Sequence, residues 1–60
     1  MADMYESWRG YVIYKEHNGR NIYMKSCYNG EYKWVADYLY AKHIKTKRIA
    51  EQHLERIRGE

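Results

Sequence analysis

The stretch YVIYKEHNGRNIYMKSCYNGEYKWVA, residues 11–36, decides the fold because it carries the same Asn-Gly pair at 18–19 and at 29–30. Asn-Gly between β-prone runs is a strong signal for a two-residue hairpin, since a type I′ turn requires positive φ at both central positions. The pattern predicts strands at 11–16, 21–27 and 31–36. These strands would form a three-stranded antiparallel meander over residues 11–36.

Two-residue loops also fix the strand register, and the register assigns each side chain to one face of the sheet. The expected pairs are Ile13–Met24, Tyr14–Tyr23, Lys15–Ile22, Met24–Val35, Lys25–Trp34 and Cys27–Tyr32. One face is then largely aliphatic and carries Tyr11, Ile13, Ile22, Met24 and Val35. The other face is aromatic around a lysine and carries Val12, Tyr14, Tyr23, Lys25, Tyr32 and Trp34.

The segment TKRIAEQHLERIR, residues 46–58, predicts a C-terminal helix with Thr46 as its N-cap and Gly59 as its stop. Residues suited to a buried stripe recur at spacings of three and four: Ile49, Ala50, His53, Leu54 and Ile57. We expect this stripe to cover the aliphatic face, although both faces of the sheet are apolar enough to accept it.

Two shorter segments complete the single domain expected over residues 1–60. Asp37 is expected to cap a short helical turn through Ala41, and residues 43–45 to form a short extended piece. For residues 1–9 two alternatives stay open, a flexible end or a segment along the sheet edge. The predicted fold class is therefore α+β, a three-stranded antiparallel meander with a C-terminal helix packed on one face.

The composition excludes several classes of protein. Cys27 is a lone cysteine, which rules out an intramolecular disulfide and suits a reducing cytoplasm. The cysteine and the three histidines lack zinc-site spacing, so we expect no metal and no cofactor. No apolar run is long enough to cross a membrane, and the N-terminal residues show no signal pattern, so we expect no membrane partner and a cytoplasmic location.

The net charge of +3 is concentrated in one part of the chain. Residues 1–40 carry equal numbers of basic and acidic side chains, so the whole excess lies in residues 41–60. Within KHIKTKR, residues 42–48, the candidate phosphate-binding residues are Lys42, Lys45, Lys47 and Arg48. The alternative is that this segment is an ordinary solvated basic surface.

The run WVADYLYAKHIKTKRIAEQHL, residues 34–54, resembles a pattern in very small proteins encoded by bacteriophages and prophages. The matching positions are Trp34, Asp37, Ala41, Lys42, Ile44, Thr46, Lys47, Ala50 and Glu51. The resemblance implies a β-meander with a helix, a phage origin and a location in the bacterial host cytoplasm. The strand order and the helix TKRIAEQHLERI are also similar to the three-stranded DNA-binding domains at the N-termini of phage-type tyrosine integrases.

Three functional hypotheses follow. An enzyme is rejected, because no nucleophile–base arrangement or phosphate loop is suggested and so short a chain can scarcely enclose a pocket. We expect a non-enzymatic phage accessory protein that binds a host protein and inhibits or redirects host machinery, with a homodimer as a further option. The predicted partner-binding residues are Tyr14, Tyr23, Lys25, Tyr32 and Trp34 on the face that the helix leaves free.

Two alternatives to this binding face remain. Residues 1–9 could fold over the aromatic face, with Tyr5 or Trp8 filling it. The second alternative is a small DNA- or RNA-binding protein, in which aromatic rings stack on bases and the basic segment holds phosphates.

Overall fold

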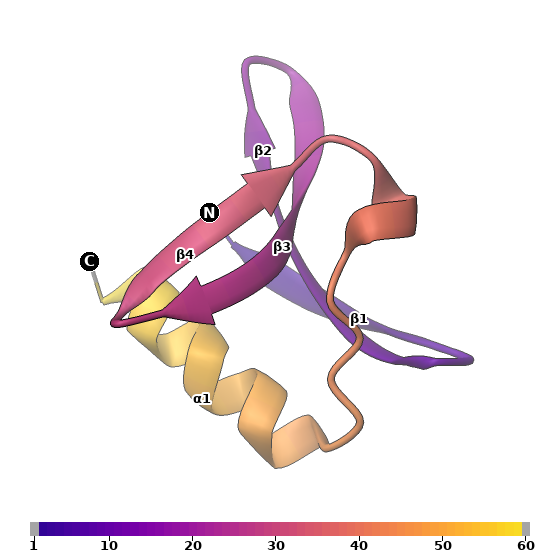
Figure 1. Cartoon of the computed structure of the whole chain (residues 1–60), viewed down its shortest axis with the longest axis vertical. Coiled ribbons are helices and arrows are strands. Elements are labelled where there is room, and N and C mark those ends of the chain that lie inside the picture. Colours follow the sequence, from indigo (N-terminus) through magenta and orange to yellow (C-terminus); the bar gives the residue numbers. More distant parts are fainter. Residues whose placement is uncertain (1, 60) are drawn as a thin grey trace.

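The computed structural model describes residues 2–59 and shows an antiparallel sheet with one helix against it (Figure 1). The elements in chain order are β1 (Asp3–Ser7), β2 (Gly10–His17), β3 (Arg20–Tyr28), β4 (Glu31–Val35), the 3₁₀ turn η1 (Tyr38–Tyr40) and α1 (Lys47–Arg58). The sheet order is β1-β2-β3-β4. The predicted α+β class is confirmed, but the meander has four strands rather than three.

The two Asn-Gly turns form as expected. Asn18 and Asn29 both have φ of 53°, and Gly19 and Gly30 both have φ of 79°. Positive φ at both central positions is what a type I′ turn requires. The predicted pairing of Tyr14 with Tyr23 across the first turn is confirmed.

The additional strand is β1, so residues 3–7 take the edge position rather than a flexible one. β1 pairs with β2 through a turn at Trp8 and Arg9, with Tyr5 opposite Val12. The Ser7 hydroxyl donates to the Gly10 carbonyl at 2.9 Å and closes this turn. The turn was missed in the sequence because Ser-Trp-Arg-Gly lacks the Asn-Gly signal.

A β-bulge in β3 changes the register of the second hairpin. The pairing of Cys27 with Tyr32 is confirmed, but the register shifts between Met24 and Ser26. Trp34 therefore lies opposite Met24, and Val35 lies opposite Tyr23, so the predicted pairs Met24–Val35 and Lys25–Trp34 are wrong. An extra residue on one strand shifts every later pair by one position and so exchanges the faces.

The bulge moves Tyr32 and Trp34 to the face that packs against α1. Both side chains are half-buried and contact the main core. Burying part of two large aromatic side chains stabilises by roughly 2 kcal/mol or more. The bulge disturbs one hydrogen bond between β3 and β4, whose net contribution is about 1 kcal/mol. Burial of the two rings therefore outweighs the loss of this hydrogen bond.

The main core lies between the sheet and α1. Ile13 and Met24 are fully buried from the sheet side, and Ala50 and Leu54 are buried from the helix. The helix thus covers the face that carries Ile13 and Met24, as expected. Ile49 was predicted on the buried stripe but is 47% exposed, because the buried face of α1 is centred on Ala50 and Leu54 and Ile49 lies to one side of it.

The helix begins and ends where the sequence indicated, with Thr46 and Gly59 at its two cap positions. Thr46 occupies the N-cap position but its side chain makes no capping hydrogen bond. Gly59 follows the last helical residue with a φ of −78°, outside the left-handed region. Near this end, the Arg58 side chain donates to the Ala2 carbonyl at 3.0 Å and ties α1 to β1.

The sheet is forked, and residues 42–44 fill the fork. Figure 1 shows the β1–β2 and β3–β4 hairpins diverging away from the β2–β3 turn, with α1 across the open end. The Lys42 amide donates to the Met24 carbonyl at 2.9 Å, so the segment is bonded to β3. Tyr11 and Ile44 exchange two backbone hydrogen bonds, of 2.7 and 2.9 Å, so the segment is also bonded to β2. The predicted extended piece at 43–45 is thereby confirmed at Ile44.

Gly10 allows this close approach. A Cβ at Gly10 would lie 2.8 Å from the Ile44 carbonyl oxygen, and the φ of Gly10 is +140°. Both the contact and the backbone conformation therefore require glycine.

The second face of the sheet is closed by η1. Asp37 caps this turn as predicted, because its carboxylate accepts a hydrogen bond from the Leu39 amide at 2.9 Å. The cap holds Tyr38 over the sheet, where its ring packs 5.7 Å from that of Tyr23. Val12, which alternates with Ile13 along β2, is fully buried on this face.

Candidate functional site

The structure divides the five predicted partner-binding residues between two faces. Tyr14 and Tyr23 lie opposite one another on the face turned away from α1. Lys25 occupies the bulge and is exposed. Tyr32 and Trp34 lie on the helix side. The prediction of one shared aromatic face is wrong, because it depended on an unbroken register through β3.

Tyr14 and Tyr23 are covered by other rings of the chain. Tyr5 packs 5.5 Å from Tyr14, and Tyr38 lies between Tyr5 and Tyr23 at 6.4 and 5.7 Å. The Tyr38 hydroxyl also lies 3.3 Å from His43 Nε2. Partial burial and the adjacent Tyr38 raise the pKa of Tyr5 to about 12, although 37% of its surface is exposed. Tyr5 therefore fills this face, as one alternative anticipated.

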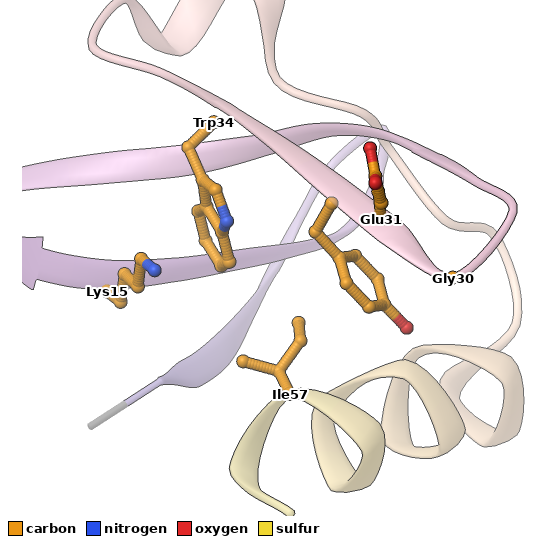
Figure 2. Close-up of a pocket in the computed structure, with 6 residues that line it drawn as sticks. Lys15, Gly30, Glu31, Trp34 and Ile57 are labelled. Atoms are coloured by element: carbon orange, nitrogen blue, oxygen red, sulfur yellow. The ribbon is translucent and has the colours of Figure 1, made fainter. Parts of the chain in front are cut away.

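Tyr32 and Trp34 instead line an open groove between β4 and the C-terminal end of α1. The groove has a volume of about 560 Å³. Its walls are formed by Lys15, Gly30, Glu31, Tyr32, Trp34 and Ile57. Figure 2 shows Trp34 and Ile57 directed toward the same space, with the Lys15 amine beside the indole and the Glu31 carboxylate turned away from the helix.

Lys15 places one positive charge at the rim of this groove. Its Nζ lies 4.3 Å from the centre of the Trp34 ring, which is cation–π geometry. Across residues 2–59 the structure shows one ion pair, between Arg58 and Asp3 at 3.7 Å, so no carboxylate pairs with Lys15. The groove thus joins two aromatic rings to an amine that has no ion-pair partner among residues 2–59.

Tyr32 joins the groove to α1 through a polar contact. Its hydroxyl lies 3.2 Å from His53 Nδ1, and the two rings meet edge to face. Burial raises the pKa of Tyr32, and Cys27 raises it further, while Arg56 opposes the change. Burial lowers the pKa of His53, and the positive charges of Arg56 and Lys42 lower it further. His53 is therefore neutral at pH 7 and available to hydrogen-bond the phenol.

The predicted phosphate-binding residues also separate in space. Lys42 lies near enough to His53 to affect its pKa. Lys45 directly follows Ile44, Lys47 and Arg48 lie in the first turn of α1, and all three are exposed. The first turn of α1 contains no acidic side chain, and these cations make no ion pair with any carboxylate in the described part of the chain.

Trp8 is the most exposed large apolar side chain among residues 2–59. It lies at the β1–β2 turn with 92% of its surface exposed, and the Arg9 guanidinium carbon is 5.6 Å from its ring centre. Sequence reasoning considered Trp8 a candidate to fill the aromatic face, which it does not do. The available signal was Gly10, which follows Trp8-Arg9 and marks a turn.

Comparison of the chain with protein-family models, with curated proteins and with solved structures finds no match. In the described part of the chain no three His, Cys, Asp or Glu side chains converge as metal ligands would. The helices there are too short or too polar to cross a bilayer.

Proposed function

We propose that this chain is a non-enzymatic binding protein whose groove between β4 and α1 takes a segment of a partner protein. The observation that supports the proposal most is the wall made by Trp34, Tyr32 and Ile57, three half-buried side chains beside a groove that is open to solvent. Large aromatic side chains dominate the energetics of protein interfaces, so the two rings are the anchors that a partner would use.

The charge of the groove defines the partner's chemistry. Lys15 is held against the Trp34 ring, no carboxylate within residues 2–59 forms an ion pair with it, and the Glu31 side chain points away (Figure 2). Arg56 lies near the Tyr32 hydroxyl, where it offers a second positive charge. The groove therefore fits an apolar side chain followed closely by Asp or Glu.

The position of β4 favours an extended partner segment. β4 is the last strand of the sheet, so its outer backbone groups have no neighbouring strand. An added strand can pair with such an edge while alternate side chains enter a pocket beside it. Following the resemblance to phage-encoded proteins, we propose that this segment belongs to a host protein whose activity is inhibited or redirected.

Selection of a displayed library of random linear peptides on the folded chain tests this proposal. We expect enrichment of peptides in which Asp or Glu lies next to an aromatic or aliphatic residue. A Trp8→Phe variant leaves Trp34 as the single tryptophan, so binding in the groove changes its fluorescence. Lys15→Glu should weaken the selected peptide about tenfold or more, because a rim charge reverses sign.

Lys25→Glu is the matched control, since it makes the same substitution on an exposed residue that does not line the groove. Equal loss of affinity in both variants would contradict the proposal, as would peptide binding with no response from Trp34. The host partner can be sought with a photo-crosslinking amino acid at position 15 or 25. Crosslinks to the same bacterial protein from both positions, or none from position 15, would count against the groove.

A further inference from the structure

The exposed Trp8 is held close to the basic segment by backbone contacts. Tyr11 and Ile44 form an antiparallel bridge, so residues after Ile44 run alongside β2 toward the Trp8–Arg9 turn. The Ile44 carbonyl oxygen lies so close to Gly10 that a Cβ there would be 2.8 Å away. The turn and the beginning of the segment 45–48 are therefore neighbours whose relative position is fixed by the main chain.

This neighbourhood is strongly cationic. Arg9, Lys45, Lys47 and Arg48 are all exposed, and none is within ion-pair distance of a carboxylate in residues 2–59. Glu6 and Glu51 lie near Tyr11, because they add to the effect of burial in raising the pKa of its phenol. The exposed cations of the turn and of the segment 45–48 outnumber these two carboxylates, so this part of the molecule carries a net positive charge.

We propose that Trp8 and Arg9, together with Lys45, Lys47 and Arg48, form a site for single-stranded nucleic acid. In this site the Trp8 indole stacks on one unpaired base, and the surrounding cations neutralise the phosphates on either side. An exposed aromatic ring beside a positively charged surface is how proteins bind single strands without reading their sequence. The site is separate from the groove and uses none of its residues.

Single strands fit this surface better than the other polyanions. The base faces of a duplex are stacked on one another, so a ring that projects from a two-residue turn finds no free base face there. A protein interface would surround the central tryptophan with apolar side chains, whereas here the neighbours are charged. An anionic membrane would attract the same cations, and vesicles are therefore included in the test.

Binding of fluorescein-labelled oligothymidylate, followed by anisotropy, tests the proposal with the complete chain. We expect binding that weakens steeply as salt rises, because cations released from phosphates drive it. Trp8→Ala should lower the affinity about tenfold with little change in salt dependence, because it removes stacking and no charge. The double variant Lys45→Glu/Lys47→Glu should instead reduce the salt dependence as well as the affinity.

Tyr28→Ala is the matched control for Trp8→Ala, because Tyr28 is an aromatic residue 76% exposed at the β3–β4 turn. Lys33→Glu is the control for reversal of charge at an exposed site. Equal losses in Trp8→Ala and Tyr28→Ala would overturn the proposal. So would equal or tighter binding of a duplex of the same length, or binding of phosphatidylserine vesicles without binding of oligothymidylate.

A failure of the nucleic-acid proposal can be distinguished from a failure of the proposed peptide binding in the groove. Lys15→Glu should leave oligothymidylate binding unchanged, and Trp8→Ala should leave binding of the selected acidic–apolar peptide unchanged. Loss of both activities in either variant would indicate a single shared surface and would contradict this second site.

Discussion

The two tryptophans lie in regions that differ in almost every physical respect. Trp34 is half-buried on a strand, faces Met24 across the sheet and forms a wall of the groove. Trp8 lies on a turn, is 92% exposed and has charged neighbours. The environment of each tryptophan is therefore set by an irregularity of the backbone. For Trp34 it is the bulge in β3, and for Trp8 it is the close approach of Gly10 to Ile44.

The greatest loss in the free energy of unfolding is expected when the backbone contact between Gly10 and Ile44, next to the Trp8 turn, is broken. Gly10→Ala places a Cβ 2.8 Å from the Ile44 carbonyl oxygen at a φ of +140°. We expect a loss of about 3 kcal/mol in the free energy of unfolding, from the clash and the unfavourable φ together. Urea denaturation followed by circular dichroism measures this loss.

Gly19→Ala is the control for that variant, because Gly19 also has positive φ but has open space around it. It should cost about 1 kcal/mol, the backbone contribution alone. If the two alanine variants were equally stable, the contact with Ile44 would not hold the Trp8 turn in place.

Truncating each tryptophan to alanine tests the difference between the two regions directly. Trp34→Ala should lower the free energy of unfolding by about 2–3 kcal/mol, because the ring packs against the core under the end of α1. Trp8→Ala should change it by less than about 0.5 kcal/mol, because the ring contributes little buried surface. Thermal unfolding of the two variants side by side checks this, and similar losses would show that the bulge is misplaced.

A smaller loss of stability is expected from changes to the cap of η1, the turn that precedes residues 42–44. Asp37→Ala removes the acceptor for the Leu39 amide and should cost about 1 kcal/mol. Asp37→Asn keeps a capping side chain and should cost only a few tenths of a kcal/mol. Hydrogen exchange at the Leu39 amide separates the variants. Equal protection in both would mean that η1 is held by the packing of Tyr38 rather than by its cap.

The smallest predicted effect is a pH dependence of the free energy of unfolding that arises from His53, which contacts Tyr32 beside the groove. The pKa of His53 is lowered from its ordinary value of 6.5, so the unfolded chain binds a proton first as the pH falls. Stability should therefore be unaffected above pH 6.5 and decline from there down to the lowered pKa of the folded chain. His53→Gln should remove this decline, measured as the urea midpoint between pH 7 and 5. A decline of equal size in the variant would assign it to other groups.

Sequence reasoning succeeded where structure is set by neighbouring residues. The Asn-Gly turns, the Asp37 cap and the helix after Thr46 each depend on a few adjacent side chains, and each forms as expected. The groove could not be predicted in this way. It depends on a bulge at Lys25, and no glycine marks that position. The bulge is favoured by tertiary packing, namely the contact of Tyr32 with His53 of α1 and the packing of Trp34 against the core.

The site proposed near Trp8 was anticipated only in part, because the basic residues were predicted as phosphate-binding without Trp8. Its parts, Trp8 and the basic segment, are far apart in the sequence, and backbone bonds between Tyr11 and Ile44 bring their two stretches of chain together. Such bonds involve atoms that every residue possesses, so side-chain patterns carry no trace of them. Gly10 was the single local signal, and a glycine alone does not indicate that Ile44 will pack against it.

The fork filled by residues 42–44 also has a consequence for the order of folding. All three hairpins close through short turns and can form within microseconds, each from residues that lie before position 36. Pairing of β2 with β3 connects the two outer hairpins at one end only, and their diverging ends are joined when Lys42 and Ile44 bond to β3 and β2. We therefore expect the segment 42–44, which is synthesised after all four strands, to fix the two outer hairpins relative to one another last.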